Sequence, residues 1–379
     1  MKKFNNILIA TDKFKFTLSA KDAVNAIYKG LKDYNNIKIH KLPIADGGEG
    51  TSEILSVFFN AKKVNITVNN PIFNKIKTHY YFSDKNKTAI IDLASASGLQ
   101  LLKKIEQKPM QTSSFGTGEI ILDALNKGAK KIIIGLGGSA TNDCGIGAAN
   151  ALGYKFLNSK GVELKAIGKN LINISKIDNS NVTPLLKEVE IIALYDVKNK
   201  LYGKNGAAYV FAKQKGANNT EINILDKGLK NITQIIKYQY SKNISNIKGG
   251  GAAGGFGAGA FAFFNTKLIQ GSNFIFDTIN IDNYINNSDL IITGEGKFDK
   301  QSLDGKIVGE LIKKADYFKK PTIVICGVSE LKKEDVKSKY LQSIIPLFSY
   351  DVDIEIAKNK SRTLISERIR LLFKDYLYF

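Results

Sequence analysis

The sequence predicts an α/β fold built on parallel sheets. Short apolar runs alternate along the chain with amphipathic segments, and polar, glycine-containing loops follow the apolar runs. Runs such as residues 7–10 and 132–134 have the length of buried strands and fall far short of the roughly 18 residues that a membrane span needs. Strands that alternate with helices are typical of parallel βαβ units with helices on both faces of the sheet. At 379 residues the chain has room for about two domains.

The individual elements follow from hydrophobic periodicity and from turn residues. Ser19 is a candidate N-cap with Asp22 in the capping-box position, and apolar residues at helical spacing predict a helix over residues 20–31. Further helices are predicted from near Thr51 and over residues 307–315. The predicted strands are residues 7–10, 37–42, 131–136, 190–195, 289–293, 322–326 and 344–347, with a polar loop at 294–299.

Composition argues against several classes of protein. The formal net charge is +20, which could indicate a nucleic-acid partner. However, all positive residues except Arg362, Arg368 and Arg370 are lysines, and arginine is the residue that makes bidentate phosphate and guanine contacts. With two cysteines and two histidines, neither a disulfide framework nor a Cys/His zinc site is expected. We therefore expect a cytoplasmic protein without a nucleic-acid or membrane partner.

Carboxylates and glycines gather in the loops that follow the predicted strands. In parallel sheets, ligands bind beyond the carboxyl ends of the strands. Mg²⁺ needs one or two protein carboxylates, and a kinase needs a carboxylate to accept a proton from the attacking hydroxyl. One such residue alone is usually a helix cap or a turn residue, but the repetition favours a site for an anionic ligand and a divalent cation. The carboxylates are Asp46, Glu49, Asp196, Glu295 and Asp299, with Lys15, Lys215 and Lys306 in or beside such loops.

Two glycine-rich segments have both a ligand-binding and a structural interpretation. In residues 248–260, glycines would let backbone N–H groups approach phosphate oxygens, or would allow a closely packed Gly/Ala helix. Residues 135–140 fit the Gly-x-Gly-x-x-Gly/Ala fingerprint of dinucleotide-binding folds, but no acidic residue follows at the end of the next strand. Within this second segment and after it, Ser139, Thr141 and Asn142 could bind a hydroxy acid or cap the following helix. No P-loop sequence occurs.

Seven segments occur along the chain in a definite order. They are IATDKFK from residue 9, PIADGGEGT from 43, SFGTGE from 114, GLGGSATND from 135, QKGA from 214 (after Asp196), GAAGG from 251 and TGEGK from 293. In this order and over this length, from about residue 7 to residue 328, the sequence resembles the bacterial class I glycerate kinases. It departs from the family pattern at Lys13 and Phe16, where the family has Ser and Gly, and both residues adjoin a predicted ligand loop. We expect these two departures to affect the preference for the hydroxy acid.

The resemblance implies two α/β domains, one inserted in the other, with the active site in the cleft between them. A flavodoxin-like domain would comprise residues 1–65 and 286–379, and the inserted domain residues 66–285. The implied reaction is ATP-dependent phosphorylation of D-glycerate to phosphoglycerate, usually 2-phosphoglycerate, assisted by Mg²⁺. These small molecules would be the partners, and the oligomeric state is left open, with a homodimer as one option.

The resemblance and the loop positions together assign roles to residues. Asp196 is the first choice of general base because it ends a predicted buried strand, and Lys15 and Asp46 join it as catalytic residues. The expected substrate-binding residues are Asp12, Lys15, Asp46, Glu49, Ser139, Asn142 and Asp143. The expected nucleotide-binding residues are Gly137, Gly138, Gly254, Gly255, Glu295 and Lys306, and the expected metal ligands are Asp196, Glu295 and Asp299.

Two other classes of function remain as alternatives. A nicotinamide-dependent oxidoreductase, suggested by residues 135–140, would bind NAD(P) and would not require Mg²⁺. A non-catalytic basic binding protein would associate with DNA or RNA in a strongly salt-dependent manner and would turn over no nucleotide.

Overall fold

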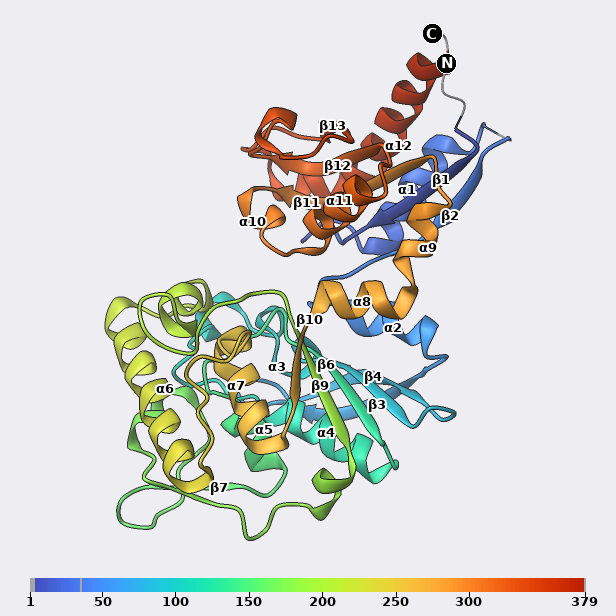
Figure 1. The fold of residues 1–379 in the computed structure, drawn as a ribbon. Helices are drawn as coiled ribbons and strands as arrows, with labels where there is room; N and C mark the ends of the chain where they lie inside the picture. The colour runs from blue at the N-terminus through green and yellow to red at the C-terminus, as the bar shows by residue number, and fades with distance from the viewer. Residues whose placement is uncertain (1–3, 35, 378–379) are drawn as a thin grey trace. The chain divides into compact units, whose positions relative to one another are not determined.

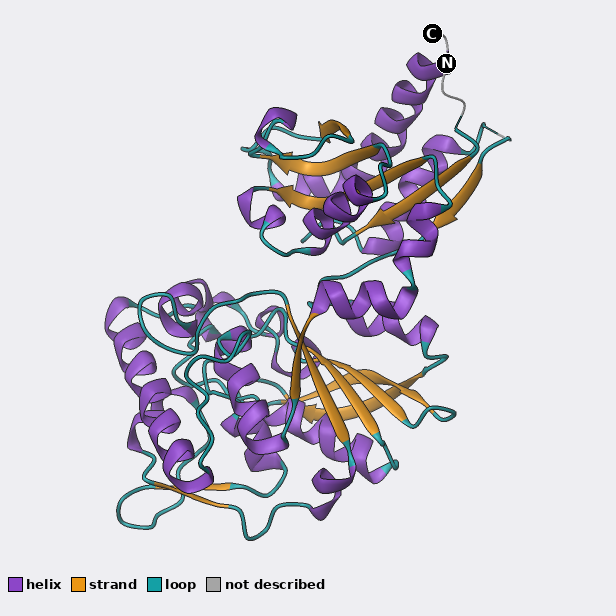
Figure 2. Ribbon diagram, in the orientation of Figure 1, coloured by secondary structure: helices purple, strands orange, loops and turns teal. Residues whose placement is uncertain are grey.

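The chain folds into two compact units, and the second is inserted in the first (Figure 1). The computed structural model describes residues 4–34 and 36–377. Unit 1 comprises Met1–Asp46 and Ser272–Phe379, and unit 2 comprises Gly47–Gly271. The sequence suggested junctions at 65/66 and 285/286, and the contacts divide the chain at 46/47 and 271/272. Both units combine helices with a sheet, as predicted (Figure 2).

Unit 1 contains a five-stranded parallel sheet in the order β2-β1-β11-β12-β13. Counted within the unit this order is 2-1-3-4-5, that of flavodoxin-like folds, so the predicted fold class is confirmed. The chain runs from β1 and from β11 toward opposite edges of the sheet, which makes these two neighbours the topological switch point where such folds bind ligands. The strands are β1 (Asn6–Thr11), β2 (Lys38–Lys41), β11 (Leu290–Phe298), β12 (Thr322–Ser329) and β13 (Leu341–Pro346).

The helices of unit 1 pack on this sheet through apolar faces. Ser19 caps α1 as predicted, because its Oγ accepts a hydrogen bond of 3.1 Å from the N–H of Asp22. One core cluster joins alternate residues of β1, such as Ile7 and Ile9, to apolar residues of α1 and α12, including Ile365. The helices are α1 (Ala20–Leu31), α8 (Gly271–Ile279), α9 (Ile281–Asn286), α10 (Lys300–Leu303), α11 (Ile307–Tyr317) and α12 (Ile354–Leu377).

Unit 2 contains a six-stranded mixed sheet in the order β10-β9-β6-β5-β4-β3. Strands β5, β6, β9 and β10 are parallel, whereas β3 and β4 form an antiparallel hairpin at one edge. The strands are β3 (Lys62–Asn69), β4 (Lys75–Ser83), β5 (Thr88–Asp92), β6 (Lys131–Gly135), β9 (Glu190–Tyr195) and β10 (Lys267–Gln270), with a small separate pair, β7 (Lys155–Leu157) and β8 (Lys176–Asp178). The helices are α2 (Thr51–Phe58), α3 (Ala94–Ser97), α4 (Phe115–Asn126), α5 (Ile146–Ala151), α6 (Asn219–Tyr240) and α7 (Ala252–Phe264).

Most predicted elements are present, with one correction that concerns the site. Residues 294–299 were expected to form a loop, but β11 continues to Phe298 because its ladder with β12 extends through Glu295 and Lys297. Glu295 therefore projects from a strand and not from a flexible turn. Within the described residues, no helix has both the length and the apolar character that crossing a bilayer would require.

Gly30 lets α1 and α12 approach closely in unit 1 (Figure 1). The Oγ of Ser366 on α12 donates a hydrogen bond of 2.8 Å to the carbonyl of Ala26, one turn before Gly30. A Cβ atom at Gly30 would lie 2.7 Å from the carbonyl oxygen of Ser366 and 2.9 Å from the side chain of Ile369. Such contacts are too short to form without a shift of one helix.

We predict that Gly30→Ala destabilises unit 1 although alanine favours helix by about 1 kcal/mol over glycine. The overpacking at the α1–α12 contact should cost about 1 to 3 kcal/mol and lower the Tm of the unit. Thermal unfolding followed by circular dichroism measures the change. Lys29→Ala is the matched control, because Lys29 is the exposed neighbour on the same helix and its replacement should leave Tm nearly unchanged. An equal or higher Tm for Gly30→Ala would contradict this description of the contact.

Candidate active site

In unit 2, polar loops cluster at the carboxyl edge of the parallel strands. Asp92 of β5, Gly135 of β6 and Leu194 of β9 are successive neighbours across the ladder, so the segments that follow them start side by side. The loop at residues 47–50 covers the end of β6. A Cβ atom at Gly137 would lie 2.4 Å from the Cα of Gly48, which explains why the sequence has glycine at this crossing.

The carboxylate of Asp143 holds the loop after β6 in place. Asp143 is fully buried, and its oxygens accept hydrogen bonds from the N–H and the Oγ of Ser114, at 2.7 and 2.8 Å, and from the N–H groups of Gly145 and Gly147. Burial raises the pKa of this carboxyl, and the donated hydrogen bonds oppose that shift. Asp143 was predicted to bind substrate, and these four donors give it a structural role as an anchor between residues 113–115 and 145–147.

Asn142, the residue before this anchor, is different. Its side chain is fully buried, and neither polar atom of its amide has a hydrogen-bond partner among the described residues. An unsatisfied buried polar group costs about 1 to 3 kcal/mol, so Asn142 in this position lowers the stability of the folded protein. The predicted assignment of Asn142 to ligand binding agrees with this unused hydrogen-bonding capacity.

The backbone around Asn142 contains several left-handed residues. Cys144 and Ala253, which carry side chains, have φ values of 52° each, and Gly254 has a φ of 66°. The carbonyl of Gly254 accepts a hydrogen bond from the N–H of Cys144 at 3.2 Å. A Cβ atom at Gly254 would lie 2.0 Å from the carbonyl oxygen of Thr141, so the first turn of α7 packs closely against the loop that contains Asn142. Strained backbone that is held by its surroundings is typical of functional sites.

Two further residues complete the unit 2 site. Asp196 follows β9 immediately and is partly buried. Lys215 was expected to face an anion, but it is buried and its ammonium donates a hydrogen bond of 2.7 Å to the carbonyl of Thr141. Burial lowers the pKa of Lys215 to about 8, against the opposing effect of the nearby Asp143 charge.

Sequence reasoning missed Asp92. Its carboxylate accepts hydrogen bonds of 2.9 Å from the N–H groups of Gly50 and Ser52 and from the Oγ of Ser52, at the start of α2. This contact ties the loop at residues 47–50 to the sheet, and Glu49 in the same loop is exposed. The sequence offered a signal, since Asp92 ends an apolar strand, but no glycine flanks it.

In unit 1, carboxylates gather at the switch point between β1 and β11. Asp12 follows β1, with its N–H donating to the carbonyl of Gly294, and both Asp12 and Glu295 are buried. Burial raises the pKa of Asp12, and the charge of Asp46 adds to the shift. Burial likewise raises the pKa of Glu295 to about 7, against the attraction of Lys306, and its Oε1 has no partner among the described residues.

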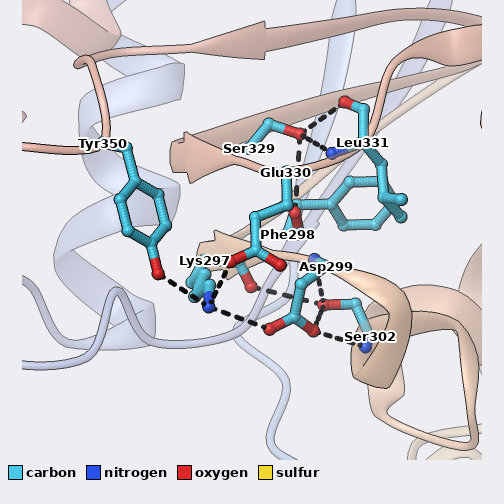
Figure 3. A network of polar contacts seen from close by, with 8 residues as sticks. All are labelled: Lys297, Phe298, Asp299, Ser302, Ser329, Glu330, Leu331 and Tyr350. Atoms are coloured by element: carbon cyan, nitrogen blue, oxygen red, sulfur yellow. Dashed lines mark hydrogen bonds and ion pairs between the residues drawn. The ribbon is translucent and has the colours of Figure 1, made fainter.

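A second polar network in unit 1 engages Asp299 (Figure 3). Its carboxylate caps α10 through the N–H of Ser302 at 3.1 Å and pairs with the ammonium of Lys297 at 3.4 Å. Lys297 also pairs with Glu330 at 2.8 Å and donates to the hydroxyl of Tyr350 at 3.4 Å. Asp299 was predicted to bind metal, and its carboxylate has these partners within the protein. The Oε1 of Glu295, in contrast, has none among the described residues.

The segment after β1 forms a tight turn in unit 1. Two backbone hydrogen bonds join Phe14 to Leu18, and Lys15 and Phe16 are exposed at the tip. Phe16 has a φ of 69°, a conformation that favours glycine, and its ring lies 5.1 Å from the ammonium of Lys15.

Each unit thus brings together part of the predicted set. Unit 1 holds Asp12, Lys15, Asp46, Glu295, Asp299 and Lys306, and unit 2 holds Glu49, Gly137, Gly138, Ser139, Asn142, Asp143, Asp196, Gly254 and Gly255. The dinucleotide alternative loses its structural support, because β6 ends at Gly135 and the next helix, α5, begins only at Ile146. In a dinucleotide fingerprint the glycine turn leads directly into a helix.

Comparison with known proteins decides the family. The chain matches the Glycerate kinase family over residues 7–376. The chain belongs to the glycerate kinase family. The family predicted from the seven ordered segments is therefore confirmed, and with it the prediction of an enzyme of the glycerate kinase type.

Relatives of this glycerate kinase family member match it over most of its length. It is 35% identical over 367 residues to the glycerate kinase of Halalkalibacterium halodurans, which covers 97% of both chains. It is 39% identical over 322 residues to the glycerate 2-kinase of Escherichia coli, which covers 85% of this chain and 84% of that protein. A crystal structure assigned as a glycerate kinase 2 of Salmonella typhimurium LT2 superposes with a TM-score of 0.82 at 32% identity, covering 100% of each chain.

We predict that Glu295 makes unit 1 less stable as the pH rises. In the folded chain its pKa is about 7, against an ordinary 4.5, so the unfolded state loses the proton first. Stability that is present below pH 4.5 should fall as the pH rises to 7, by about 3 kcal/mol at 1.36 kcal/mol for each pKa unit. The Tm of Glu295→Gln minus that of the wild type, measured in EDTA, should therefore grow from pH 5 to pH 8. A difference that does not change with pH would disprove the buried, proton-binding state.

We predict that the family member tolerates Asn142→Leu structurally. Leucine has a similar size and removes two unpartnered polar atoms, so Tm should stay the same or rise. Asp143→Asn is the contrast, because its amide nitrogen would face N–H donors that the carboxylate now satisfies, at a cost of about 2 to 4 kcal/mol. Thermal unfolding of both variants tests the distinction. A large loss of stability in Asn142→Leu would show that Asn142 is a structural residue.

Proposed function

We propose that this protein transfers the γ-phosphoryl group of ATP to D-glycerate, with Mg²⁺, and that 2-phosphoglycerate is the product. The observation that carries the proposal is the match to the glycerate kinase family over residues 7–376. The relative from Escherichia coli, 39% identical, is a glycerate 2-kinase, which favours the 2-hydroxyl as the acceptor. Phosphoryl transfer depends on positioning and on neutralising charge, and the polar loops of both units suit these tasks.

Unit 2 supplies groups suited to the hydroxy acid. The Asn142 amide offers a donor and an acceptor, Ser139 a hydroxyl, and Asp196 a carboxylate. In the proposed step, the acceptor hydroxyl gives its proton to Asp196 as its oxygen bonds to the γ-phosphorus, while the bond from that phosphorus to the ADP oxygen breaks.

Unit 1 supplies groups suited to the nucleotide and to Mg²⁺. The Oε1 of Glu295 is buried and has no partner among the described residues. The charge of Asp46 raises the pKa values of both Asp12 and Glu295, so a bound cation would relieve the repulsion between these carboxylates. When bound, Mg²⁺ would neutralise charge on the phosphate oxygens. Among the described residues no set of three or more His, Cys, Asp or Glu side chains is arranged to hold a metal, and Mg²⁺ needs only one or two carboxylates when phosphates accompany it. Lys306 adds positive charge for the phosphates, and the exposed ammonium of Lys15 in the same unit could bind the carboxylate of the hydroxy acid.

A coupled assay with ATP, Mg²⁺ and D-glycerate tests the proposal, and phosphorus NMR identifies the product. We expect ADP formation that depends on D-glycerate and a product resonance of 2-phosphoglycerate. Formation of 3-phosphoglycerate would show that the 3-hydroxyl is the acceptor, and the proposed glycerate kinase activity would still stand. Absence of glycerate-dependent turnover, or a Tm raised by NAD and not by ATP with Mg²⁺, would reject the function.

We predict that Asp196→Asn lowers kcat with D-glycerate by about 100-fold or more, because the amide cannot accept the hydroxyl proton. Binding of ATP measured without Mg²⁺ should change little. Glu188→Gln is the control, since Glu188 is an exposed carboxylate of unit 2 that forms an ion pair with Lys130 on the surface. Nearly full kcat in Asp196→Asn, with unchanged binding, would show that another group takes the proton.

A further inference from the structure

Lys215 is the one lysine described in the structure whose ammonium holds the loop that carries Asn142. The ammonium is buried and donates to the carbonyl of Thr141 at 2.7 Å. That carbonyl belongs to the peptide unit that links Thr141 to Asn142, so the hydrogen bond fixes the backbone directly before the unpartnered amide. The Oγ of Ser139 approaches the same oxygen at 3.4 Å.

The chain is shaped to bury this lysine. A π-helical turn, Ala208–Ala212, leads into a 3-10 turn, Lys213–Lys215, which Gly216 ends with a φ of 98°. A π-helical turn is uncommon and occurs frequently at functional sites. The N–H of Ala217 returns to the carbonyl of Ala212 and closes this segment, so Lys215 is held inside unit 2 by local backbone structure.

Asp143 attracts the ammonium of Lys215 electrostatically, but no hydrogen bond joins the two side chains among the described residues. The carboxylate of Asp143 already accepts four hydrogen bonds from Ser114, Gly145 and Gly147. The only hydrogen bond recorded for the ammonium within the described chain goes to a neutral carbonyl. Burial outweighs the attraction of Asp143, because the pKa of Lys215 is still lowered to about 8, so removing this ammonium from water costs stability.

We propose that Lys215 is a positioning residue for the phosphorylation reaction. Its ammonium donates a hydrogen bond to the Thr141 carbonyl, and Gly254 lies so close to the same oxygen that no Cβ atom would fit between them. Asp143, the residue that follows Asn142, anchors the loop. These contacts hold the amide of Asn142 in the orientation in which it would bind the hydroxy-acid acceptor. The buried positive charge of Lys215 favours an anionic acceptor nearby. This inference rests on the proposed function only for the identity of the acceptor.

The kinetic test compares Lys215→Met with a matched lysine variant in the full-length protein. Lys242 of unit 2 also donates to carbonyls, those of Phe261 and Ala262, and burial also lowers its pKa, but it lies at the far end of α7 from the Asn142 loop. Lys215→Met should lower kcat/KM for D-glycerate by about 10- to 100-fold and leave the KM for ATP within about twofold, because a displaced acceptor group costs this much. Lys242→Met should lose stability and keep both constants.

A double-variant comparison tests whether Lys215 acts through Asn142. If it does, adding Lys215→Met to Asn142→Leu should reduce kcat/KM little beyond Asn142→Leu alone, because both changes remove the same interaction. Lys215→Arg, which keeps the charge and the donors, should restore part of the activity. Independent, multiplicative losses in the double variant, or a loss in Lys215→Met that merely follows Tm as in Lys242→Met, would overturn the positioning role.

Hydrogen exchange gives a readout that does not depend on the acceptor. In Lys215→Met, amides of residues 139–145 should exchange faster than in the wild type, while those of residues 256–264 remain unchanged. If the wild-type protein does not phosphorylate D-glycerate but exchange increases in this loop, the proposed function fails and the loop-holding contact stands. If exchange in residues 139–145 does not change, the inference about Lys215 fails whatever the acceptor is.

Discussion

The site in unit 2 depends on the four hydrogen bonds that the buried carboxylate of Asp143 accepts. They join Ser114, before α4, to Gly145 and Gly147, at the start of α5, and they offset the cost of removing a charge from water. With this anchor complete, the neighbouring Asn142 can remain unsatisfied without unfolding the loop. The strained backbone at Cys144 and Ala253 is held in the same way, by contacts around it.

Unit 1 prepares its polar groups by a different physical means. At its switch point, buried carboxylates are held near one another with few donors, so Asp12 and Glu295 have raised pKa values. Such an arrangement lowers the stability of the folded unit when the carboxylates are ionised, and it favours binding of a cation or a proton. Unit 2 thus holds a buried amide with unused hydrogen-bonding capacity, whereas unit 1 holds buried carboxylates whose pKa values are raised.

Residues of the same type have different roles in the structure, and the sequence did not predict which role each one has. Glu295 and Asp299 lie four positions apart in one glycine-containing segment. Asp299 caps α10 and pairs with Lys297, whereas the Oε1 of Glu295 has no partner among the described residues. The extension of β11 decided this, because it placed Glu295 inside the sheet. Lys215 was expected to bind an anion, but its ammonium donates a hydrogen bond to a carbonyl 74 positions earlier. Asp92 could be recognised as the end of a strand, but the sequence did not indicate that its carboxylate binds the N–H of Ser52.

The sequence by itself determined the family, the α/β class and the positions of most strands that lead to the site. These follow from ordered motifs and from hydrophobic periodicity, which are local properties of the chain. Only the tertiary structure decided which polar residues are anchors and which keep unused hydrogen-bonding capacity. That distinction depends on donors and acceptors brought from distant segments, such as Ser114 to Asp143, and on burial, which exists only once the chain has packed.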